Sequence, residues 1–241
     1  MTFFLILILF ILPFQNIKGQ GIDYFFNQGL SKHSQKDYKG AIADFSRAIE
    51  LNPDNSVTYY CRGLSRIETK DFRGAIKDFD HAIAINTSYE WAYFHRAIAK
   101  HGNKDFRGAV EDFTKTLEFD PQKEEPYYRR ALSRHALLDY RGAIADFDRV
   151  LLFDDQKVDA YYNRAQARFA ISDFHGTIAD LDEVLSRNLN NIDAYYWRGL
   201  AKLRAGKLYD GCEDLRRAEE YGHPKTKNLI RDYCNLPEPK R

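Results

Sequence analysis

The sequence predicts an all-α protein built from stacked helical hairpins. Three observations lead to this prediction: a motif returns every 34 residues, each period holds two amphipathic helical patterns, and no insertion breaks the register from residue 22 to about 223. A fixed period of this length is typical of repeat proteins, in which each repeat covers the apolar face of the next. Residues 1–19 have a different character and are considered separately.

The recurring motif is Asp-aromatic-x-Gly-Ala. It occurs at residues 37–41, 71–75, 105–109 and 139–143, with a near copy at 173–177 and a degenerate sixth copy at 208–211. Six copies in one register define six repeats, at residues 22–55, 56–89, 90–123, 124–157, 158–191 and 192–223. We expect a capping helix at residues 224–234 to cover the last apolar face, and residues 235–241 to form a tail.

Each period contains two helical patterns. The first carries a pair of aromatic residues, as in Tyr59-Tyr60, and a Gly or Ala four positions after the first aromatic. The second has apolar residues at i, i+4 and i+7, such as Ala41, Phe45 and Ala48. This spacing places the apolar residues on one face of a helix.

These features resemble the tetratricopeptide-repeat family. The matching features are the large residue of the first helix, the small residue four positions later, the Ala-x3-Phe-x2-Ala spacing of the second helix, and a proline near the end of the period, such as Pro53. The resemblance covers about 200 of the 241 residues. It implies a right-handed α-solenoid, a superhelix of hairpins whose first helices line a concave face. It does not identify a partner, because one fold serves many functions.

Residues 1–19 predict a signal peptide. Residues 3–14 form an apolar run, shorter than the roughly 20 residues that span a bilayer, and Gly19 is small enough to precede a cleavage site. We therefore expect an exported protein, periplasmic or extracellular. The alternative is an uncleaved membrane anchor, because no Lys or Arg precedes the apolar run. Membrane association is expected only through this segment.

Charge and cysteine content limit the choice of partners and the redox setting. With 36 basic and 35 acidic residues, the formal net charge is +1 and gives no indication of nucleic acid as a partner. Of the three cysteines, Cys212 lies in the second helix of repeat six and Cys234 ends the capping helix, with the turn at Gly222 about midway between them. Antiparallel packing would bring the two together, so we predict a disulfide. The alternative is two buried thiols.

Charged residues also recur with the period. One first-helix position holds Arg62, Arg96, Arg130, Arg164 and Arg198, and one second-helix position holds Asp44, Asp78, Asp112, Asp146, Asp180 and Asp214. Because repeat one has Gln28 in place of the Arg, we expect each Arg to pair with the Asp of the preceding repeat. Asp214 would then remain for Lys225 or Lys227 of the cap. A second basic column four residues after the Arg column is interpreted as a solvated face, the alternative being an anion-binding ladder.

The partner-binding groove is expected on the first helices. By the resemblance, it is lined by the second aromatic of each pair and by the residues four and seven positions later, an apolar and aromatic face suited to a peptide. Positions that vary within repeated columns are further candidates, because the scaffold makes the same demands in every repeat. The candidate groove residues are Phe26, Tyr60, Trp91, Phe94, His95, Tyr128, Arg129, Tyr162, Tyr196 and Trp197. The alternative is that these rings only stack between helices and that the variable positions are simply exposed.

No catalytic or cofactor motif accompanies the repeats. The sequence lacks a Gly-rich phosphate loop, Gly-x-Ser-x-Gly, His-Glu-x-x-His and Cys-x-x-Cys. His101 and His135 occupy equivalent places in adjacent repeats, but packed helices stand roughly 8–10 Å apart, which stretches a direct two-His bridge, and no acidic or Cys ligand accompanies them at a fixed place. We therefore expect a scaffold that binds a protein or peptide, with no enzyme activity, cofactor or metal. The alternative is a regulatory or assembly subunit of a cell-envelope enzyme complex.

Overall fold

The computed structural model describes the backbone of residues 5–234 and the side chains of residues 19–234. Over this range the regular elements are thirteen α-helices and a final π-helical turn, with no strand. The chain divides into two compact units, Met1–Pro121 and Gln122–Arg241. In each unit, consecutive helices pair into hairpins that stack on one another. The predicted all-α class and the solenoid-type stacking of helical hairpins are confirmed.

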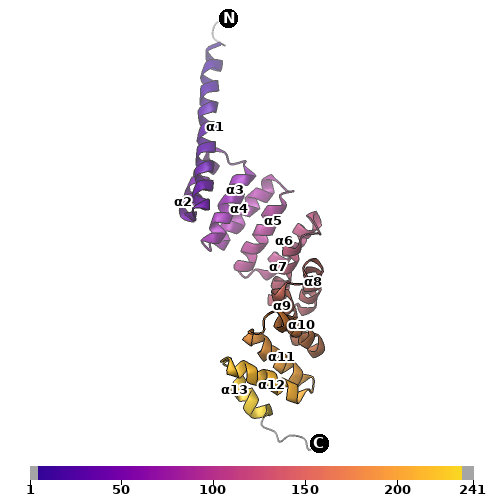
Figure 1. Cartoon of the computed structure of the whole chain (residues 1–241). Helices are drawn as coiled ribbons and strands as arrows, with labels where there is room; N and C mark the ends of the chain where they lie inside the picture. The colour runs from indigo at the N-terminus through magenta and orange to yellow at the C-terminus, as the bar shows by residue number, and fades with distance from the viewer. Residues whose placement is uncertain (1–4, 235–241) are drawn as a thin grey trace, which may run out of the picture. The chain divides into compact units, whose positions relative to one another are not determined.

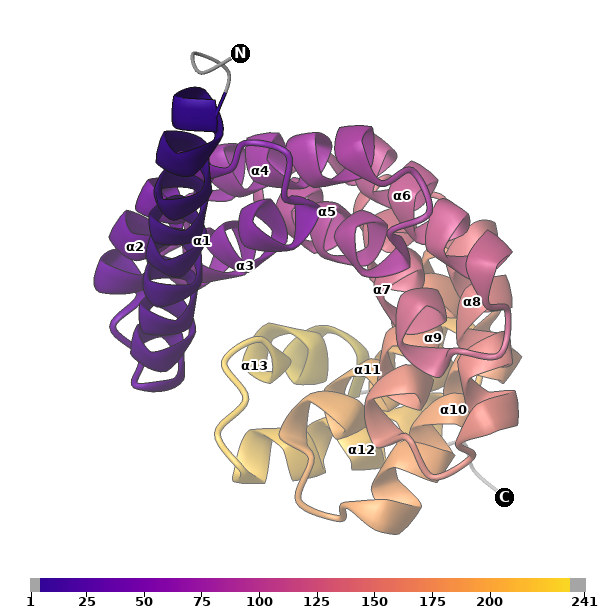
Figure 2. The same cartoon turned by 90° about the horizontal axis from the view of Figure 1, so that it is seen from above.

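The first unit holds three hairpins (Figure 1). They are α1 (Leu5–Ser34) with α2 (Tyr38–Leu51), α3 (Ser56–Glu68) with α4 (Phe72–Ile85), and α5 (Glu90–Gly102) with α6 (Phe106–Phe119). Within this unit, α2 also packs against α3, and α4 packs against α5. In Figure 2, α3 and α5 lie along one side of this unit and α4 and α6 along the other. Successive first helices contact each other, so they form a continuous face.

The second unit repeats this plan. Its hairpins are α7 (Glu124–Ala136) with α8 (Tyr140–Phe153), α9 (Val158–Ala170) with α10 (Phe174–Arg187), and α11 (Ile192–Arg204) with α12 (Leu208–Glu220). A short helix, α13 (Thr226–Leu229), continues into the π-helical turn η1 (Ile230–Cys234), and both pack on α12. We refer to α13 and η1 together as the cap.

The Asp of the recurring motif begins each second helix from α2 to α10. Asp71, for example, accepts a hydrogen bond from the backbone N–H of Gly74 at 3.0 Å. Such an N-cap satisfies an N–H that has no partner within the helix. A Cβ built on Gly74 would lie 2.1 Å from the Asp71 carboxylate, so the glycine of the motif makes room for the cap. Equivalent caps are formed by Asp37, Asp105, Asp139 and Asp173.

The core of each hairpin is a large side chain of the second helix packed on a small residue of the first. Phe79 is fully buried, and a Cβ built on Gly63 would lie 2.7 Å from its ring. The equivalent large residues are all buried: Phe45, Phe113, Phe147, Leu181 and Leu215. The small residue recognised in the sequence therefore provides the space that this ring fills, because protein interiors tolerate little overlap.

The N-terminal prediction falls largely outside the described part of the chain. Residues 1–18, most of the expected signal peptide, carry no described side chains, and Gly19 lies within the continuous helix α1. Among the helices formed by described residues, none is both long enough and apolar enough to cross a bilayer. Export and cleavage stay predictions.

Candidate functional site

The Arg column pairs within its own repeat, so the expected pairing with the preceding repeat is wrong. Arg62 Nη2 lies 2.7 Å from Asp78 Oδ1, and Arg62 Nε lies 3.0 Å from Asp78 Oδ2. The same contact at a separation of sixteen residues recurs in Arg96–Asp112, Arg130–Asp146, Arg164–Asp180 and Arg198–Asp214. The physical reason is that the antiparallel hairpin sets the two helices of one repeat side by side, facing each other along their length.

A different nitrogen of the same guanidinium reaches the preceding repeat. Nη1 contacts an aspartate two residues beyond the column Asp, at 2.6–2.7 Å in Arg96–Asp80, Arg164–Asp148 and Arg198–Asp182. Arg62 Nη1 instead donates a hydrogen bond to Ser46 Oγ at 2.9 Å. The planar guanidinium offers donors in several directions, so each of these four arginines ties two hairpins together.

The second basic column binds the same carboxylates and is not a free solvated face. Arg66 Nη1 lies 2.9 Å from Asp78 Oδ2. Asp214 contacts Arg198 at 2.6 Å and Lys202 at 2.7 Å, rather than the cap lysines as expected. The remaining pairs are Lys32–Asp44, Lys100–Asp112, Arg134–Asp146 and Arg168–Asp180. Because these cations are committed to mostly buried carboxylates, the columns have a structural role and do not form an anion-binding ladder.

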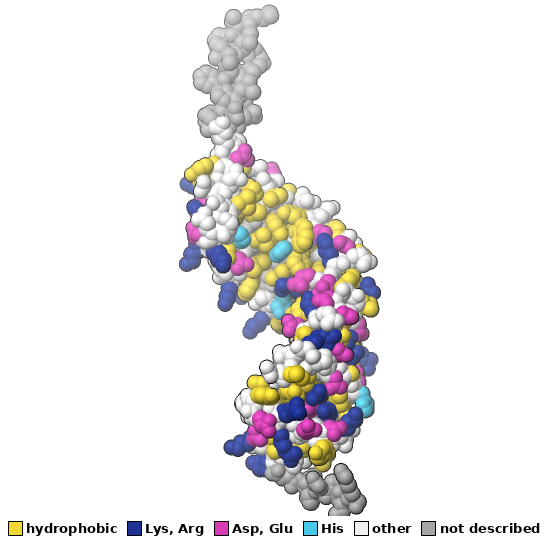
Figure 3. Space-filling model, in the orientation of Figure 1, with side chains coloured by type: hydrophobic (Ala, Val, Ile, Leu, Met, Phe, Trp, Pro, Cys, Tyr) yellow, Lys and Arg dark blue, Asp and Glu magenta, His cyan; other side chains and the backbone are white. Residues whose placement is uncertain are grey.

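The first helices of the first unit carry an apolar face that reaches the surface. Leu30 on α1, Val57 on α3 and Trp91 on α5 are 42%, 43% and 50% exposed. Tyr60 and Leu64 of α3 are half-buried. Figure 3 shows hydrophobic side chains gathered over α3 and α5, with histidines beside them. We call this surface the apolar face of the first unit.

Tyr60 is the centre of an aromatic cluster in this unit. Its ring centroid lies 5.0 Å from that of Tyr89 and 5.5 Å from that of His95, and its hydroxyl lies 3.2 Å from His95 Nδ1. Burial raises the pKa of Tyr60, with smaller effects from Tyr89 and Cys61. His95 Nδ1 also lies 2.9 Å from the backbone oxygen of Trp91, which orients the imidazole. Tyr89 was not a candidate because it precedes α5 and lies outside the helical pattern.

The contact between Tyr60 and His95 illustrates a recurring relation between repeats. The second aromatic of one repeat meets the residue 35 positions later, in the variable column. Tyr128 Oη accepts a hydrogen bond from Asn163 Nδ2 at 3.2 Å, and Tyr162 hydrogen-bonds with Trp197. Some residues of the variable column therefore have a structural role: they hydrogen-bond with the tyrosine hydroxyl of the preceding repeat, because a partly buried hydroxyl needs a partner. Phe26 has no hydroxyl, and the position 35 residues later is Cys61.

The candidate residues of the first unit differ in accessibility. Phe94 is 8% exposed and its ring centroid lies 5.8 Å from that of Phe113, so it supports the core rather than the surface. Phe26 is half-buried and packs in the same way on Phe45 at 5.9 Å. Trp91 is the accessible member of this set. Leu30, four residues after Phe26 in the expected groove line, and Val57, in a variable column, are also exposed, on α1 and α3.

The corresponding face of the second unit is more polar. Lys157 Nζ lies 4.6 Å from the ring centroid of Tyr128 and forms an ion pair with Glu124. Arg129 Nε lies 2.7 Å from Glu125 Oε1, and both side chains are more than 40% exposed. A cation over the ring face is favourable, because the ring quadrupole attracts it. This part of the second unit therefore offers charged and hydrogen-bonding groups rather than an open apolar anchor site.

Tyr196 and Trp197 are held by contacts within the second unit. The Tyr196 ring stacks on His223 with centroids 4.1 Å apart, and His223 Nε2 lies 3.3 Å from Asp193 Oδ1. Trp197 packs edge-on against Phe169 at 5.2 Å. Both candidates are half-buried. They are less accessible to a partner than Trp91.

Cys212 and Cys234 form a disulfide, with an S–S distance of 2.10 Å and a Cα–Cα distance of 5.5 Å. It joins α12 to the end of the cap. Arg216 Nη2 donates a hydrogen bond to the backbone oxygen of Cys234 at 3.2 Å, so the end of the cap is held twice.

Cys61 is unpaired and half-buried on α3. Burial raises the pKa of its thiol to about 11, so it is protonated at neutral pH and a poor nucleophile. Among residues 19–234, no group of three or more His, Cys, Asp or Glu side chains could hold a metal ion.

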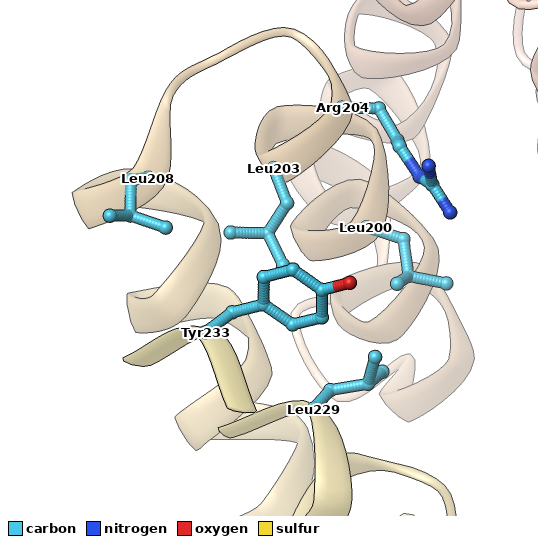
Figure 4. A pocket seen from close by; sticks show the side chains of 6 residues that line it. All are labelled: Leu200, Leu203, Arg204, Leu208, Leu229 and Tyr233. Carbon is cyan, nitrogen blue, oxygen red and sulfur yellow. The ribbon is translucent and has the colours of Figure 1, made fainter. Parts of the chain in front are cut away.

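A hollow of about 250 Å³ lies at the end of the second unit (Figure 4). It is lined by Leu200, Leu203, Arg204, Leu208, Leu229 and Tyr233. These residues come from α11, α12, α13 and η1. The hollow could not be predicted from the sequence, because it depends on how the cap sits against the last hairpin.

Stacked antiparallel helix pairs, each with a small residue packed on a large one, define a helical-hairpin repeat protein. The family model of the tetratricopeptide repeat matches residues 22–55, the range expected for the first repeat. The same period and hairpin recur through the rest of the described array, so the chain contains repeats of the tetratricopeptide type. Comparison with curated protein sequences gives no match.

Several solved structures share this fold. The C-terminal part of a TPR repeat-containing protein from Cytophaga hutchinsonii has a TM-score of 0.75 and 14% identity, over 87% of this chain and 87% of that chain. YrrB, described as a TPR protein with an unusual peptide-binding site, has a TM-score of 0.70 and 16% identity, over 78% and 97%. MamA from Desulfovibrio magneticus has a TM-score of 0.66 and 15% identity, over 70% and 96%. At such identities, the similarity shows the fold alone.

Proposed function

We propose that this chain is a non-catalytic scaffold that binds a peptide or protein segment on the first-helix faces of its repeats. The observation that carries the proposal is the apolar face of the first unit, where Leu30, Val57 and Trp91 are 42–50% exposed on three neighbouring helices. Exposed apolar side chains that gather on one surface typically mark an interaction site. Tryptophan is also frequent among residues that dominate binding energy.

The electrostatics of the scaffold support an apolar contact there. The repeated cations of α3 are bound to Asp78, which is 1% exposed, so they add little free charge to the face. We therefore propose an extended or helical segment with apolar anchor side chains as the partner of the first unit. The peptide-binding site named in the description of YrrB supports peptide binding as a role for this fold.

The second unit would contribute polar recognition. The exposed pair Arg129–Glu125 and the neighbouring pair Lys157–Glu124 can exchange ion pairs with charges on a partner. Such surface pairs contribute little stability to the protein itself, so a ligand can rearrange them at low cost. We propose that these residues select partners rather than supply most of the affinity.

We further propose that the protein is exported and acts in the periplasm or outside the cell. The apolar run at residues 3–14 supports this location, as does the Cys212–Cys234 disulfide, since disulfides persist in oxidising compartments. If residues 1–19 stay attached, the second candidate function is a membrane-anchored assembly or regulatory subunit of a cell-envelope enzyme complex. Intact mass of the mature protein separates the two, because the anchored form retains residues 1–19.

Peptide selection tests the proposed function. The immobilised full chain is offered a phage-displayed library of random 12-residue peptides, and the affinity of a selected peptide is measured by fluorescence anisotropy. We expect selected peptides rich in large apolar residues. Trp91→Ala and Val57→Asp should each weaken binding at least tenfold, because loss of a hot-spot contact costs about 2 kcal/mol or more.

The matched control is Leu189→Ala, which removes a 67% exposed leucine from the loop after α10. It should leave the affinity unchanged. Arg129→Ala should change which charged residues occur in peptides that bind the second unit. If no peptide is enriched, or if Trp91→Ala and Val57→Asp bind the selected peptide as the unaltered chain does, the proposed function is wrong.

A further inference from the structure

Six exposed cations at the three hairpin turns of the first unit have no ion-pair partner within the described part of the chain. Each turn places one cation just before the N-cap aspartate and another two residues after it. Figure 3 shows basic side chains at the lower left of the first unit, the side on which the hairpins turn in Figure 1. We call these six residues the basic edge: Lys36, Lys39, Lys70, Arg73, Lys104 and Arg107.

The first cation of each turn is not required by the backbone. All three of these lysines have a left-handed conformation, with φ between 62° and 65°. Glycine adopts this conformation most easily. In the second unit the equivalent places hold Leu138, Ser172 and Gly206, so the turn accepts side chains of any kind. Three successive lysines are therefore not a demand of the fold.

The second cation of each turn stands where a helix disfavours positive charge. Lys39, Arg73 and Arg107 lie in the first turn of α2, α4 and α6, and none of these turns contains an acidic residue. Backbone N–H groups give a helix N-terminus a partial positive charge, which repels a cation. Side chains that oppose local stability are expected at functional surfaces.

The second unit provides a comparison within the same chain. Of its six equivalent positions, Arg141 alone holds a lysine or an arginine. The other five are Leu138, Ser172, His175, Gly206 and Tyr209. Because both units are built from the same hairpins, the difference lies in the side chains and not in the fold. The basic edge is thus a property of the first unit.

We propose that the basic edge binds an extended acidic segment of another protein. The first helices of neighbouring repeats contact each other in this unit, and packed helices stand roughly 8–10 Å apart. An extended chain advances about 3.3 Å per residue. Glu or Asp at every third residue therefore meets successive turns. Because the six cations have no internal partner, the carboxylates of the segment can pair with them without first breaking an ion pair.

Carboxylates between the cations favour a partner with separated charges. Asp37, Asp71 and Asp105 each lie between the two cations of a turn, and Glu68 is exposed beside the second turn. The phosphates of a nucleic acid are densely spaced, so they would meet these carboxylates as well as the cations. The three turns also expose no large apolar side chain for insertion into a membrane. An acidic peptide segment is the partner that fits this alternation.

The basic edge is separate from the apolar face of the first unit. Trp91 lies in the first turn of α5, whereas Lys104 follows the C-terminal end of the same helix. The 13 residues of α5 span about 20 Å. The two surfaces can bind different segments, so this proposal does not rest on the function proposed above.

Charge neutralisation on the full chain tests the proposal. The probe is a fluorescent 12-residue peptide with Glu at every third position and Ser or Gly elsewhere, titrated by anisotropy. We expect binding at 50 mM salt that weakens at least tenfold at 300 mM salt, because salt screens exposed charges. The triple variant Lys39→Gln, Arg73→Gln and Arg107→Gln should weaken binding at least tenfold. Its melting temperature should not fall, because the removed charges oppose the helix N-termini.

A second variant replaces the first cation of each turn. Lys36→Gly, Lys70→Gly and Lys104→Gly together should also weaken binding at least tenfold. Glycine suits the left-handed backbone and already occupies this place at Gly206, so the turns should keep their structure. Trp91→Ala should leave the affinity for the acidic peptide unchanged, since it alters the other surface.

The matched control removes the same formal charge from exposed side chains in later turns of second helices: Arg47→Gln, Lys115→Gln and Arg149→Gln. It should bind the peptide within twofold of the unaltered chain. No binding at 50 mM salt, an equal loss in the control, or unchanged affinity in both edge variants would overturn the proposal. Tighter binding of a 12-nucleotide single-stranded DNA, or of vesicles containing phosphatidylglycerol, would overturn it as well, because the partner would then be a nucleic acid or a membrane.

Discussion

Arg62 and Asp78 face each other across the hairpin of α3 and α4. Two nitrogens of the guanidinium contact the carboxylate, at 2.7 Å and 3.0 Å, and Asp78 is 1% exposed. Arg66 contacts the same carboxylate at 2.9 Å. Two cations around one buried anion make the position sensitive to loss of the anion, because either cation left unpaired in a desolvated site is costly.

Replacement of Asp78 should therefore destabilise the protein strongly. For Asp78→Asn we expect the free energy of unfolding to fall by about 3–5 kcal/mol, the usual cost of removing one partner of a buried ion pair. Urea unfolding followed by circular dichroism measures the change. Asp80→Asn is the matched control, because its side chain is 53% exposed and its pair with Arg96 should contribute about 1 kcal/mol or less. Equal losses in the two variants would contradict the burial argument.

His135 should make stability depend on pH. Burial lowers its pKa, so near pH 6 the unfolded chain binds more protons than the folded chain. The contribution of neutral His135 to stability is therefore complete above the ordinary pKa of about 6.5 and is lost as the pH falls below that value toward the lowered pKa.

The pH effect of His135 can be isolated with a substitution that another repeat of this chain already carries at the equivalent position. His135 packs on Tyr140 at 5.2 Å, and Phe169 packs on Phe174 at 5.5 Å in the equivalent place of the next repeat. His135→Phe should thus keep the packing and reduce the loss of stability between pH 7.5 and pH 5.5, measured by urea unfolding at both values. An unchanged loss would show that other groups cause it.

Cys61 should react slowly with thiol reagents in the folded protein. Its pKa of about 11 leaves far less thiolate at pH 8 than a free cysteine has, by roughly a hundredfold. In a 5,5′-dithiobis(2-nitrobenzoate) assay, we expect one slow thiol in the native chain and one fast thiol after unfolding without reductant. A native rate equal to that of free cysteine would contradict the assigned burial.

The disulfide should stabilise the cap more than the rest of the chain. Its partners are separated by 22 residues, for which loop closure predicts about 3 kcal/mol. In the double variant Cys212→Ser with Cys234→Ser, amide exchange should accelerate in the cap while α3 and α4 keep their protection. Acceleration of equal size in both regions would show that the bond has no local role.

Much of the fold could be predicted because its determinants are local in the sequence. The apolar pattern of Ala41, Phe45 and Ala48 predicts one helix face, and α2 indeed buries all three. In the sequence analysis, the Asp of the recurring motif served only to establish the 34-residue period. Its role as a helix cap could also have been recognised, since aspartate before a helix commonly accepts an N–H bond.

The ion pairs could not be predicted from spacing alone. Arg62 follows Asp44 by eighteen residues and precedes Asp78 by sixteen, so the periodic pattern fits either partner. Because repeat one has no Arg at this position, Asp44 was the expected partner of Arg62. In the structure, Asp44 contacts Lys32 at 2.6 Å. The choice depends on which helix the arginine faces, and that follows from the antiparallel packing of the hairpin.

The sequence by itself determined that this protein is an array of helical hairpins, because periodicity and helix-forming patterns act over one or two turns of chain. The tertiary structure alone decided which side chains remain available to a partner. Trp91 and Phe94 lie three residues apart on α5, yet they are 50% and 8% exposed. Exposure depends on neighbours contributed by other helices, such as Phe113, and no local pattern contains that information.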